Sequence, residues 1–500
     1  MLRMLVTRIL FLFAIFLWPA LSWSQNFIIG KDQAPINKHD YEVLKKVAEN
    51  AQVPIEEFRH YKDRNHYIVD DNGLIYWDYN ENGIIDGDDS FAKGHLARLG
   101  NSYITNQSGS VVALTVQDSK FHKNNILNAF QSVIALYLFD NKIEDINVEN
   151  LHELRSLVVF RKGDSPVTVS ALKNLSKLAY LNINGLFLES FENMKGLDSL
   201  YQAELRQLGL SSFKGLDNMP NLKHLEVTMS KGPDDNLLAN LDNIPKNHGL
   251  ERFKLSSAYT TDISGIAHLP NLKRLELWSS NKKLNDLTPL NKLKNLEELE
   301  VTAFALKDFT FLDDMPKLKS ITAYHAPITS LSGLQEAPNL EELKLYSGKL
   351  EQISGLDGNP ELKTIYFNNH NISKLEGLDS LKKLNTLDVS RNHITKIENL
   401  KHNQCLEKLW LNSNPVKKLE NLGHLPILRE LGLERTKIKK LDGWKELDRL
   451  GKISIDPSQL EMEKSNSRYF YRYIPIKEID MKLKQSEPIS QKEYKQYGCI

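Results

Sequence analysis

An apolar pattern of the form L-x-x-L-x-L recurs along most of the chain. Its first position, here called the anchor, is Val111, Val133, Leu154, Leu178, Leu200, Leu222, Leu250, Leu272, Leu296, Leu318, Leu340, Leu362, Leu384, Leu406, Leu428 and Leu450. From Leu296 to Leu450 successive anchors are 22 residues apart every time, whereas earlier intervals run from 21 to 28 residues. A period of this length predicts stacked repeats, none of which buries its apolar face alone.

The repeat that begins at Leu384 shows what each copy is expected to form. Leu387 and Val389 flank a polar residue, and this alternation predicts a short strand whose apolar side chains point inward. Asn392 follows, where a buried amide can bond to the backbone of neighbouring turns, and Ile394 returns the chain to the core. Stacking predicts an α/β solenoid, a curved array of about 15 to 16 repeats with parallel strands on its concave face. We expect a small helical N-terminal cap and a C-terminal cap at its ends.

This pattern resembles the leucine-rich repeat, in the 22-residue class found in internalins and in phosphatase-regulating repeat proteins. The resemblance covers residues 111–455 and is strongest from Leu296 onward. The asparagine of the family stands at Asn141, Asn392 and Asn414. The same position elsewhere holds Ser280, Phe304, Ala326, Gly348, His370 or Thr436. The resemblance implies a binding protein that uses its concave face, while the replaced asparagines put a uniform curvature in question.

The outward positions of the strands are the ones expected to meet a partner. They hold Tyr137, Phe139, Phe160, Tyr180, Arg252, Arg274, Trp278, Tyr324, His325, Tyr346, Tyr366, Asn368, Trp410, Asn412 and Arg435. Tyr, Trp and Arg dominate the energetics of protein interfaces. We therefore predict a site for a protein partner at Trp278, Tyr324, His325, Tyr346, Tyr366, Asn368 and Trp410. The alternative is that these side chains only cover the sheet and pack against each other.

The first 24 residues differ from the rest. Arg3 and Arg8 precede or begin an apolar stretch that runs from Ile9 to Trp18, and Pro19 and small residues follow. This order predicts a signal peptide over residues 1–24 and a secreted or periplasmic protein. An uncleaved N-terminal anchor is the alternative. No later stretch reaches the ~20 apolar residues of a spanning helix.

Residues 25–105 precede the repeats, and helices are expected over His39–Asn50 and Pro54–Tyr61. Between 78 and 89 the sequence has the spacing of an EF-hand or dockerin-type calcium loop, with Gly83 at the sharp turn. The predicted ligands are Asp78, Asn80, Asn82, Ile84 through its carbonyl, Asp86 and Asp89. We expect a structural calcium ion that stiffens the N-terminal cap. The alternative is a turn rich in Asn, Gly and Asp that binds no metal.

The repeats are expected to occupy residues 106–456, and residues 457–500 to form a C-terminal cap and tail. Tyr469, Phe470, Tyr471 and Tyr473 are predicted to cover the last repeat, with a short interaction tail as the alternative. Cys405 and Cys499 are the two cysteines. The first is expected to be a buried thiol and the second an exposed one, and a bridge between them stays open.

Composition narrows the function. Lys plus Arg and Asp plus Glu are both 64, so net charge gives no case for nucleic acid. We find no nucleophile elbow, phosphate loop, dinucleotide fingerprint or zinc-protease motif, and we expect no enzyme. The expected function is protein binding through the concave face. The alternatives are a carbohydrate-binding or dockerin-like adhesion module, and a scaffold like the phosphatase regulators, against which the signal peptide argues.

Overall fold

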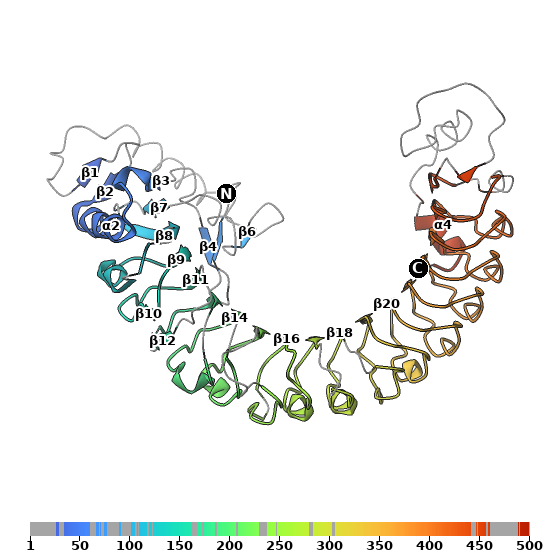
Figure 1. Cartoon of the computed structure of the whole chain (residues 1–500), viewed down its shortest axis with the longest axis horizontal. Coiled ribbons are helices and arrows are strands. Elements are labelled where there is room, and N and C mark those ends of the chain that lie inside the picture. Colours follow the sequence, from blue (N-terminus) through green and yellow to red (C-terminus); the bar gives the residue numbers. More distant parts are fainter. Residues whose placement is uncertain are drawn as a thin grey trace, which may run out of the picture. The chain divides into compact units, whose positions relative to one another are not determined.

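The computed structural model forms two compact units, one of residues 1–186 and 193–202 and one of residues 187–192 and 203–500 (Figure 1). The residues it describes are 27–29, 35–60, 67–69, 71, 75–77, 90–91, 102–105, 108, 110–117, 120–122, 124–161, 168–172, 175–185, 188–206, 209–229, 238–246, 248–279, 284–302, 306–441, 447, 449–456, 459–460, 489 and 491–499. Among these residues no helix is long and apolar enough to cross a membrane.

The first unit contains helix α2 (Lys38–Ala51), which confirms the helix expected over His39–Asn50. Asn37 caps it, because its side-chain oxygen accepts a hydrogen bond from the Asp40 N–H at 2.8 Å. Asp40 is buried and accepts a hydrogen bond of 2.7 Å from the Val111 N–H, which ties the helix to the first repeat strand. The helix expected over Pro54–Tyr61 is wrong. Its described residues hold a 3-10 turn, η1 (Ile55–Glu57), and strand β3 (Arg59–His60), because Arg59 and His60 pair with Ser102 and Tyr103 of a neighbouring strand instead of continuing a helix.

Short strands make up the rest of the first unit. They are β1 (Phe27–Ile29), β2 (Pro35–Asn37), β3 (Arg59–His60), β4 (Tyr67–Val69), β5 (Ile75–Trp77), β6 (Ser90–Phe91), β7 (Ser102–Thr105), β8 (Val111–Gln117), β9 (Ala135–Asn141), β10 (Asp145–Asn147), β11 (Ser156–Arg161), β12 (Thr168–Ala171) and β13 (Tyr180–Asn184). Strand β7 pairs antiparallel with β8, whereas β8, β9, β11 and β13 pair parallel in that order. The hairpin partner β7 therefore covers the edge that β8 would otherwise expose.

The second unit contains a regular series of parallel strands. They are β15 (His224–Thr228), β16 (Arg252–Ser256), β17 (Arg274–Trp278), β18 (Glu298–Thr302), β19 (Ser320–Tyr324), β20 (Glu342–Tyr346), β21 (Thr364–Asn368), β22 (Thr386–Asp388), β23 (Lys408–Trp410), β24 (Glu430–Gly432) and β25 (Lys452–Ser454), with β14 at Gln202–Arg206. From β15 to β25 each strand pairs in parallel with the next one along the chain. Every anchor from Val133 to Leu450 lies two residues before a strand, so the predicted parallel-strand solenoid is confirmed.

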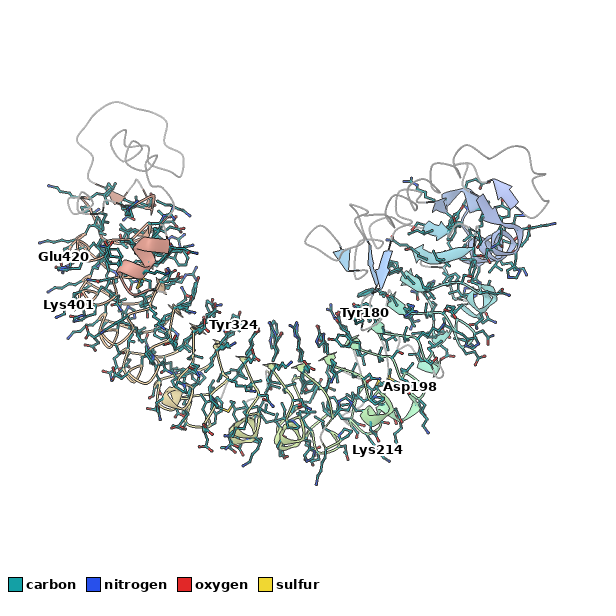
Figure 2. All side chains as sticks on the ribbon, turned by 180° about the vertical axis from the view of Figure 1, so that it is seen from behind. Tyr180, Asp198, Lys214, Tyr324, Lys401 and Glu420 are labelled. Carbon is teal, nitrogen blue, oxygen red and sulfur yellow. A yellow bond between two sulfur atoms is a disulfide. The ribbon has the colours of Figure 1, made fainter. Side chains whose placement is uncertain are left out.

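Short 3-10 helices and turns return the chain between strands. The 3-10 helices are η4 (Asn124–Ala129), η5 (Phe191–Asn193), η6 (Leu216–Asn218), η7 (Ser264–His268), η8 (Thr288–Lys292) and η9 (Leu334–Glu336). In the second unit the strands line the inner side of the bend, and these turns line its outer side (Figure 1). Figure 2 shows Tyr324 on the strand side and Lys214, Lys401 and Glu420 on the opposite side.

A ladder of main-chain hydrogen bonds fixes the register of the 22-residue repeats. The Lys319 N–H donates to the Glu297 carbonyl at 2.8 Å, and the Glu341 N–H donates to the Lys319 carbonyl at 2.8 Å. The same bond joins each later repeat to the one before it, and it ends with the Gly451 N–H and the Arg429 carbonyl at 2.9 Å. Because donor and acceptor are one repeat apart, an equal repeat length keeps the anchors stacked over one another.

Buried side chains bond to the backbone between the strands and the returns. The Asn392 amide donates to the Phe367 carbonyl at 2.7 Å, and its oxygen accepts from the Ile372 N–H at 3.0 Å. Asn414 repeats this arrangement one turn later, so the predicted role of the family asparagine is confirmed at both positions. Such bonds satisfy main-chain groups that the short strands leave unpaired in the core.

His370 takes the place of this asparagine in its own repeat. Its Nδ1 accepts a hydrogen bond from the Leu350 N–H at 3.2 Å, and its Nε2–H donates to the Leu345 carbonyl at 3.2 Å. The ring is accommodated because Gly348 lies beside it: a Cβ on Gly348 would lie 2.4 Å from the His370 Cε1 atom. Burial lowers the pKa of His370 to about 4, so the ring is neutral and uses both nitrogens.

A disulfide between Cys405 and Cys499 joins the segment of helix α4 (Gln491–Gln496) to the repeat that begins at Leu406. The two cysteines are 94 residues apart in sequence. The expected pair of free thiols is therefore wrong, and the bridge left open by the sequence is present. The Tyr494 hydroxyl donates a hydrogen bond to the side chain of Glu407, the residue that follows the anchor Leu406. Of the predicted C-terminal cap, residues 461–488, including the four aromatic residues from Tyr469 to Tyr473, lie outside the described residues.

The pKa of His370 predicts a pH-dependent stability. Its folded pKa of about 4 lies below the ordinary value of 6.5, so the unfolded chain binds the additional proton as pH falls. We expect full stability of this repeat above pH 6.5 and a loss of about 3 kcal/mol as pH falls toward 4. Hydrogen exchange of peptides spanning residues 345–372 measures it. The variant His370→Asn supplies the family amide without titrating, and an unchanged pH slope in that variant would contradict the assignment.

The disulfide predicts a local loss of stability on reduction. Closing a loop of this length restricts the unfolded chain by at most about 4–5 kcal/mol. We expect Cys499→Ser to speed hydrogen exchange in α4 and in the repeat that begins at Leu406, with the first unit unaffected. Treating the wild type with a reductant serves as the matched control and should reproduce the variant. Exchange rates that do not change at α4 in either sample would show that the bridge does not hold the helix.

Candidate functional site

The strand face of the second unit consists of the side chains at the first and third positions of each strand from β15 to β25, and at the fifth position of the five-residue strands β15 to β21. In β18 these are Glu298, Glu300 and Thr302, which are exposed or half-buried, while Leu299 and Val301 between them are buried. This alternation recurs in β16, β17 and β20. The side chains of one position form rows that cross neighbouring strands in register. Any partner that docks on the strands meets these rows.

Four aromatic side chains form a chain of ring contacts across this face, here called the aromatic ladder. The Tyr324 and Tyr346 rings are stacked, with centroids 5.0 Å apart and planes at 9°. Tyr346 contacts Tyr366 at 6.3 Å, and Tyr366 contacts Trp410 at 6.0 Å, both tilted. The Trp410 ring is accommodated because Gly432 is beside it: a Cβ there would lie 2.7 Å from the Trp410 Cδ1 atom. All four side chains are half-buried.

The ladder shields its own hydroxyl groups from water. Burial raises the pKa of Tyr346 to about 12, and the neighbouring Tyr324 and Tyr366 raise it further. Burial also raises the pKa of Tyr324 and of Tyr366 above their ordinary value. The three hydroxyls therefore stay protonated across the physiological range and can donate hydrogen bonds to a docked molecule.

The other predicted partner-binding residues lie near this ladder but are not all part of it. Trp278 is 41% exposed, and Thr302 separates it in register from Tyr324. The Lys254 ammonium lies over the Trp278 ring, 5.1 Å from its centroid. Asn368 is paired in register with Tyr346. His325 follows β19 with φ of +53° and is exposed.

The early group of outward aromatics is buried, which corrects the expectation of an exposed surface there. Tyr137 is 0% and Tyr180 is 1% exposed. They belong to one apolar cluster with Val158, against which the half-buried Phe160 and Tyr201 pack. Small side chains on the neighbouring strands, such as Ala113, leave room for these rings to lie inside the cluster. The exposed aromatic surface is thus the one in the second unit.

Charged side chains fill much of the remaining strand face and are paired with each other. Arg274 donates to Glu276 at 2.9 Å and to Glu298 at 2.6 Å. Lys254 lies 3.6 Å from both Glu226 and Glu276. Because most of these groups are partly exposed, each pair contributes only about 0–1 kcal/mol, and the network mainly orders the side chains.

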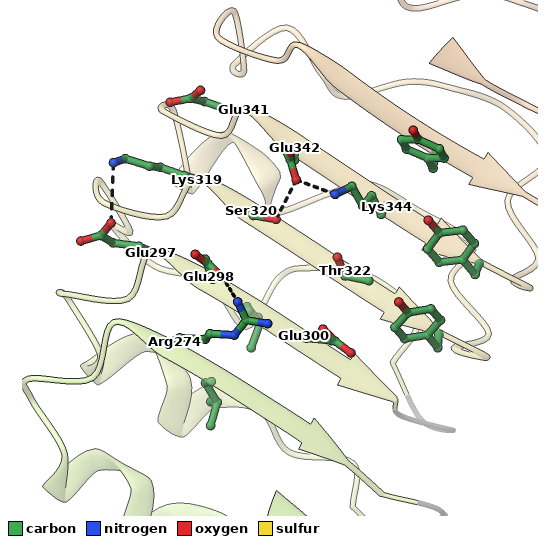
Figure 3. A pocket seen from close by; sticks show the side chains of 15 residues that line it. Arg274, Glu297, Glu298, Glu300, Lys319, Ser320, Thr322, Glu341, Glu342 and Lys344 are labelled. Carbon is green, nitrogen blue, oxygen red and sulfur yellow. Dashed lines mark hydrogen bonds and ion pairs between the residues drawn. The ribbon is translucent and has the colours of Figure 1, made fainter. Parts of the chain in front are cut away.

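An open groove of about 840 Å³ lies on β17–β21, where the charged rows meet the aromatic ladder (Figure 3). Tyr324, Tyr346 and Tyr366 form one side of it. Most of the rest is polar, and the other lining residues are Arg274, Leu275, Glu297, Glu298, Leu299, Glu300, Lys319, Ser320, Thr322, Glu341, Glu342 and Lys344. The outward positions predicted from the sequence included the three tyrosines and Arg274 but not the glutamates. Their signal was present as Glu at the first and third positions of β18 and at the first position of β20.

The predicted calcium ligands lie outside the described residues, because Asp78, Asn80, Asn82, Ile84, Asp86 and Asp89 all fall within 78–89. Within the described part of the chain no group of three or more His, Cys, Asp or Glu side chains is placed to hold a metal ion. Calcium binding therefore stays a prediction from the sequence.

Comparison with known proteins decides the type of fold. Residues 360–402, which contain β21 and β22, match the family described as Leucine Rich repeats (2 copies). An LRR protein from Leptospira interrogans has a similar structure, with a TM-score of 0.53 and 20% identity, covering 68% of this chain and 89% of that one. The chain has the leucine-rich-repeat fold. No curated protein matches it in sequence.

Other leucine-rich-repeat structures are similar at the same low identity. A chain of the Toll–Spätzle complex from Drosophila is 17% identical with a TM-score of 0.52, and the match covers 67% of this chain and 49% of that one. An internalin from Listeria monocytogenes is 19% identical with a TM-score of 0.41, covering 70% and 82%. Similarity at identities this low concerns the fold alone. The function has to be argued from the residues of the strand face.

Proposed function

We propose that this leucine-rich-repeat protein binds a protein partner through the strand face of its second unit. The aromatic ladder from Tyr324 to Trp410 carries the proposal. Its rings are held by one another and by the strands, so little side-chain freedom is lost when a partner covers them. Large aromatic side chains of this kind supply the anchors of protein interfaces. A chain of similar fold takes part in the Toll–Spätzle complex.

Carbohydrate binding is the weaker proposal for the same face. Sugars stack on the open faces of aromatic rings, and here Tyr324 and Tyr346 stack on each other with planes at 9°. The inner face of each ring is therefore occupied. Trp278 is the ring with the larger exposure, yet Lys254 lies over it. A glycan array separates the two proposals, since binding to a defined sugar would favour the carbohydrate module.

The proposal includes export from the cytoplasm to the periplasm or the exterior. The predicted signal peptide over residues 1–24 supports it. So does the disulfide between Cys405 and Cys499, because such bridges persist in oxidising compartments and are rare in the cytosol. In this setting the protein acts as a binding module rather than an enzyme, since sequence and strand face alike offer hydrophobic and ionic contacts rather than an activated nucleophile.

The aromatic ladder predicts the outcome of affinity capture. The triple variant Trp278→Ala/Tyr324→Ala/Tyr346→Ala is compared with wild type and with Lys401→Ala/Glu420→Ala on the opposite side of the unit. A partner recovered by wild type is then purified and titrated against each form. We expect at least about a tenfold loss of affinity for the triple variant, since removal of interface aromatics costs roughly 2 kcal/mol or more. Equal affinity of all three forms would exclude this face as the binding surface.

The proposed calcium ion predicts a stability that depends on calcium. With a dissociation constant on the order of 10⁻⁴ M, millimolar calcium stabilises the N-terminal region by about 1–2 kcal/mol. We expect a chelator to lower the first thermal transition of the wild type. The variant Asp78→Ala should melt at the lower temperature with or without calcium. A wild-type transition that does not respond to the chelator would remove the structural ion from the proposal.

A further inference from the structure

Glu300 differs from the other acids around the groove because its charge is not balanced. Ion pairs join four of the others to basic side chains: Glu297 to Lys319, Glu298 to Arg274, Glu341 to Lys363 and Glu342 to Lys344. Within the described part of the chain Glu300 makes no salt bridge, and no dashed line reaches it in Figure 3. It occupies the third position of β18, at the middle of the strand face.

The neighbours of Glu300 explain this. In register its carboxylate lies between Glu276 on β17 and Thr322 on β19, so one neighbour repels it and the other is neutral. Burial raises the pKa of Glu300, and Glu276 raises it further, while Arg274, Lys254 and a hydrogen bond from the Trp278 side chain offset the shift only in part. The indole N–H is neutral, so this hydrogen bond does not balance the charge. A carboxylate that is partly withdrawn from water and has no ion pair is stabilised when a cation arrives.

The basic side chains of this groove are already engaged. Arg274 is shared between Glu276 and Glu298. Lys344 donates to Glu342 at 2.6 Å and faces the Tyr366 ring at 6.0 Å. Two strand spacings separate Lys344 from Glu300 in register, roughly 9–10 Å, with only the short Thr322 between them. This distance leaves room for one side chain supplied from outside.

Aromatic rings border the same space. Tyr324 follows Thr322 at the end of β19, and Tyr346 stacks on its far side. Figure 3 shows Glu300 and the tyrosine rings on one open groove. An acid beside aromatic rings fits a flat cation that donates hydrogen bonds in its plane and stacks through its face. A guanidinium has both properties, whereas an ammonium is a point charge that binds water more strongly.

We propose that the groove on β17–β21 receives an arginine side chain of the protein partner, with its guanidinium paired to Glu300 and lying against the Tyr324 ring. The proposal rests on the proposed function, because it names what the partner places on that face. The stem of the arginine crosses Thr322, and the paired acids at the edge of the groove exclude an acidic residue from the same position. Glu300 thereby selects the partner, while the aromatic ladder supplies the contact area.

Titration with short blocked peptides tests the proposal without knowledge of the partner. The probe is Ac-Gly-Arg-Gly-NH₂, and the controls carry citrulline, which is neutral and of similar shape, or glutamate. Each is titrated against the full chain by ligand-observed NMR at physiological salt, up to about 20 mM. We expect the arginine peptide to bind, the citrulline peptide to bind at least about tenfold more weakly, and the glutamate peptide not to bind, since only the guanidinium forms a charge-assisted hydrogen bond with Glu300.

Glu300→Gln should lose the arginine preference and melt no lower than wild type, because it removes an unbalanced charge. Glu361→Gln is the matched control: its carboxylate pairs with Lys383 at 2.6 Å outside the groove, and its affinity should stay within about twofold of wild type. Absence of arginine binding, equal binding of citrulline, or retained preference in Glu300→Gln each overturns the proposal. If these peptides fail while the triple aromatic variant still loses its purified partner, the proposed function stands and only the arginine assignment falls.

Discussion

The structure depends on the pairing of main-chain groups between consecutive repeats. Each repeat donates the N–H that follows its anchor to the corresponding carbonyl one repeat earlier, as Glu341 does to Lys319 and Lys363 does to Glu341, both at 2.8 Å. The bond is also made across the longer intervals, as between the Glu251 N–H and the Lys223 carbonyl at 2.9 Å and between the Glu297 N–H and the Lys273 carbonyl at 2.7 Å. This ladder of main-chain hydrogen bonds therefore keeps the strands in register while the returns between them vary in length. It also places outward side chains of successive strands in straight rows, and these rows form the candidate site.

In the interior, different residue types meet the same need for hydrogen bonds to buried main-chain groups. Main-chain groups beside the returns need a buried partner, and Asn392, Asn414 and the neutral His370 all supply one acceptor and one donor. Asn359 and Asn403, both 0% exposed, supply amides on the other side of the core, to the Leu334 and Leu378 carbonyls at 2.8 and 2.9 Å. At His370 the replacement of the family asparagine is thus compensated inside the core.

Periodicity predicted the strands, their parallel order and which residues face outward, because those follow from local alternation and from repeat length. It could not predict which outward residues stay exposed: Tyr137 and Tyr180 have outward register but lie in an apolar cluster formed with other strands. The disulfide could not be predicted either, since the spacing of the repeats does not determine where Cys499 lies relative to Cys405. Tyr324 and Tyr346 were predicted correctly as outward neighbours. The lack of an ion pair at Glu300 in the described part of the chain could not be predicted, because an ion pair depends on the rotamers of the surrounding basic side chains.

The rows on the strand face separate two tasks that a binding surface must perform. Stacked rings such as Tyr324 and Tyr346 give contact area that is ordered in advance, but apolar area alone discriminates poorly between partners. Charged side chains that already form an ion pair, such as Arg274 and Glu298, gain little from a partner's charge. They therefore disfavour a partner with a like charge at that place more than they favour one with an opposite charge. Glu300 changes this balance, because it is hydrogen-bonded to Trp278 but has no ion pair among the described residues, whereas the neighbouring acids have one. The cation preference proposed for it is local and directional, and the adjoining rings limit which cation fits. In the proposed binding mode, selectivity therefore arises where the two kinds of row meet, at Glu300.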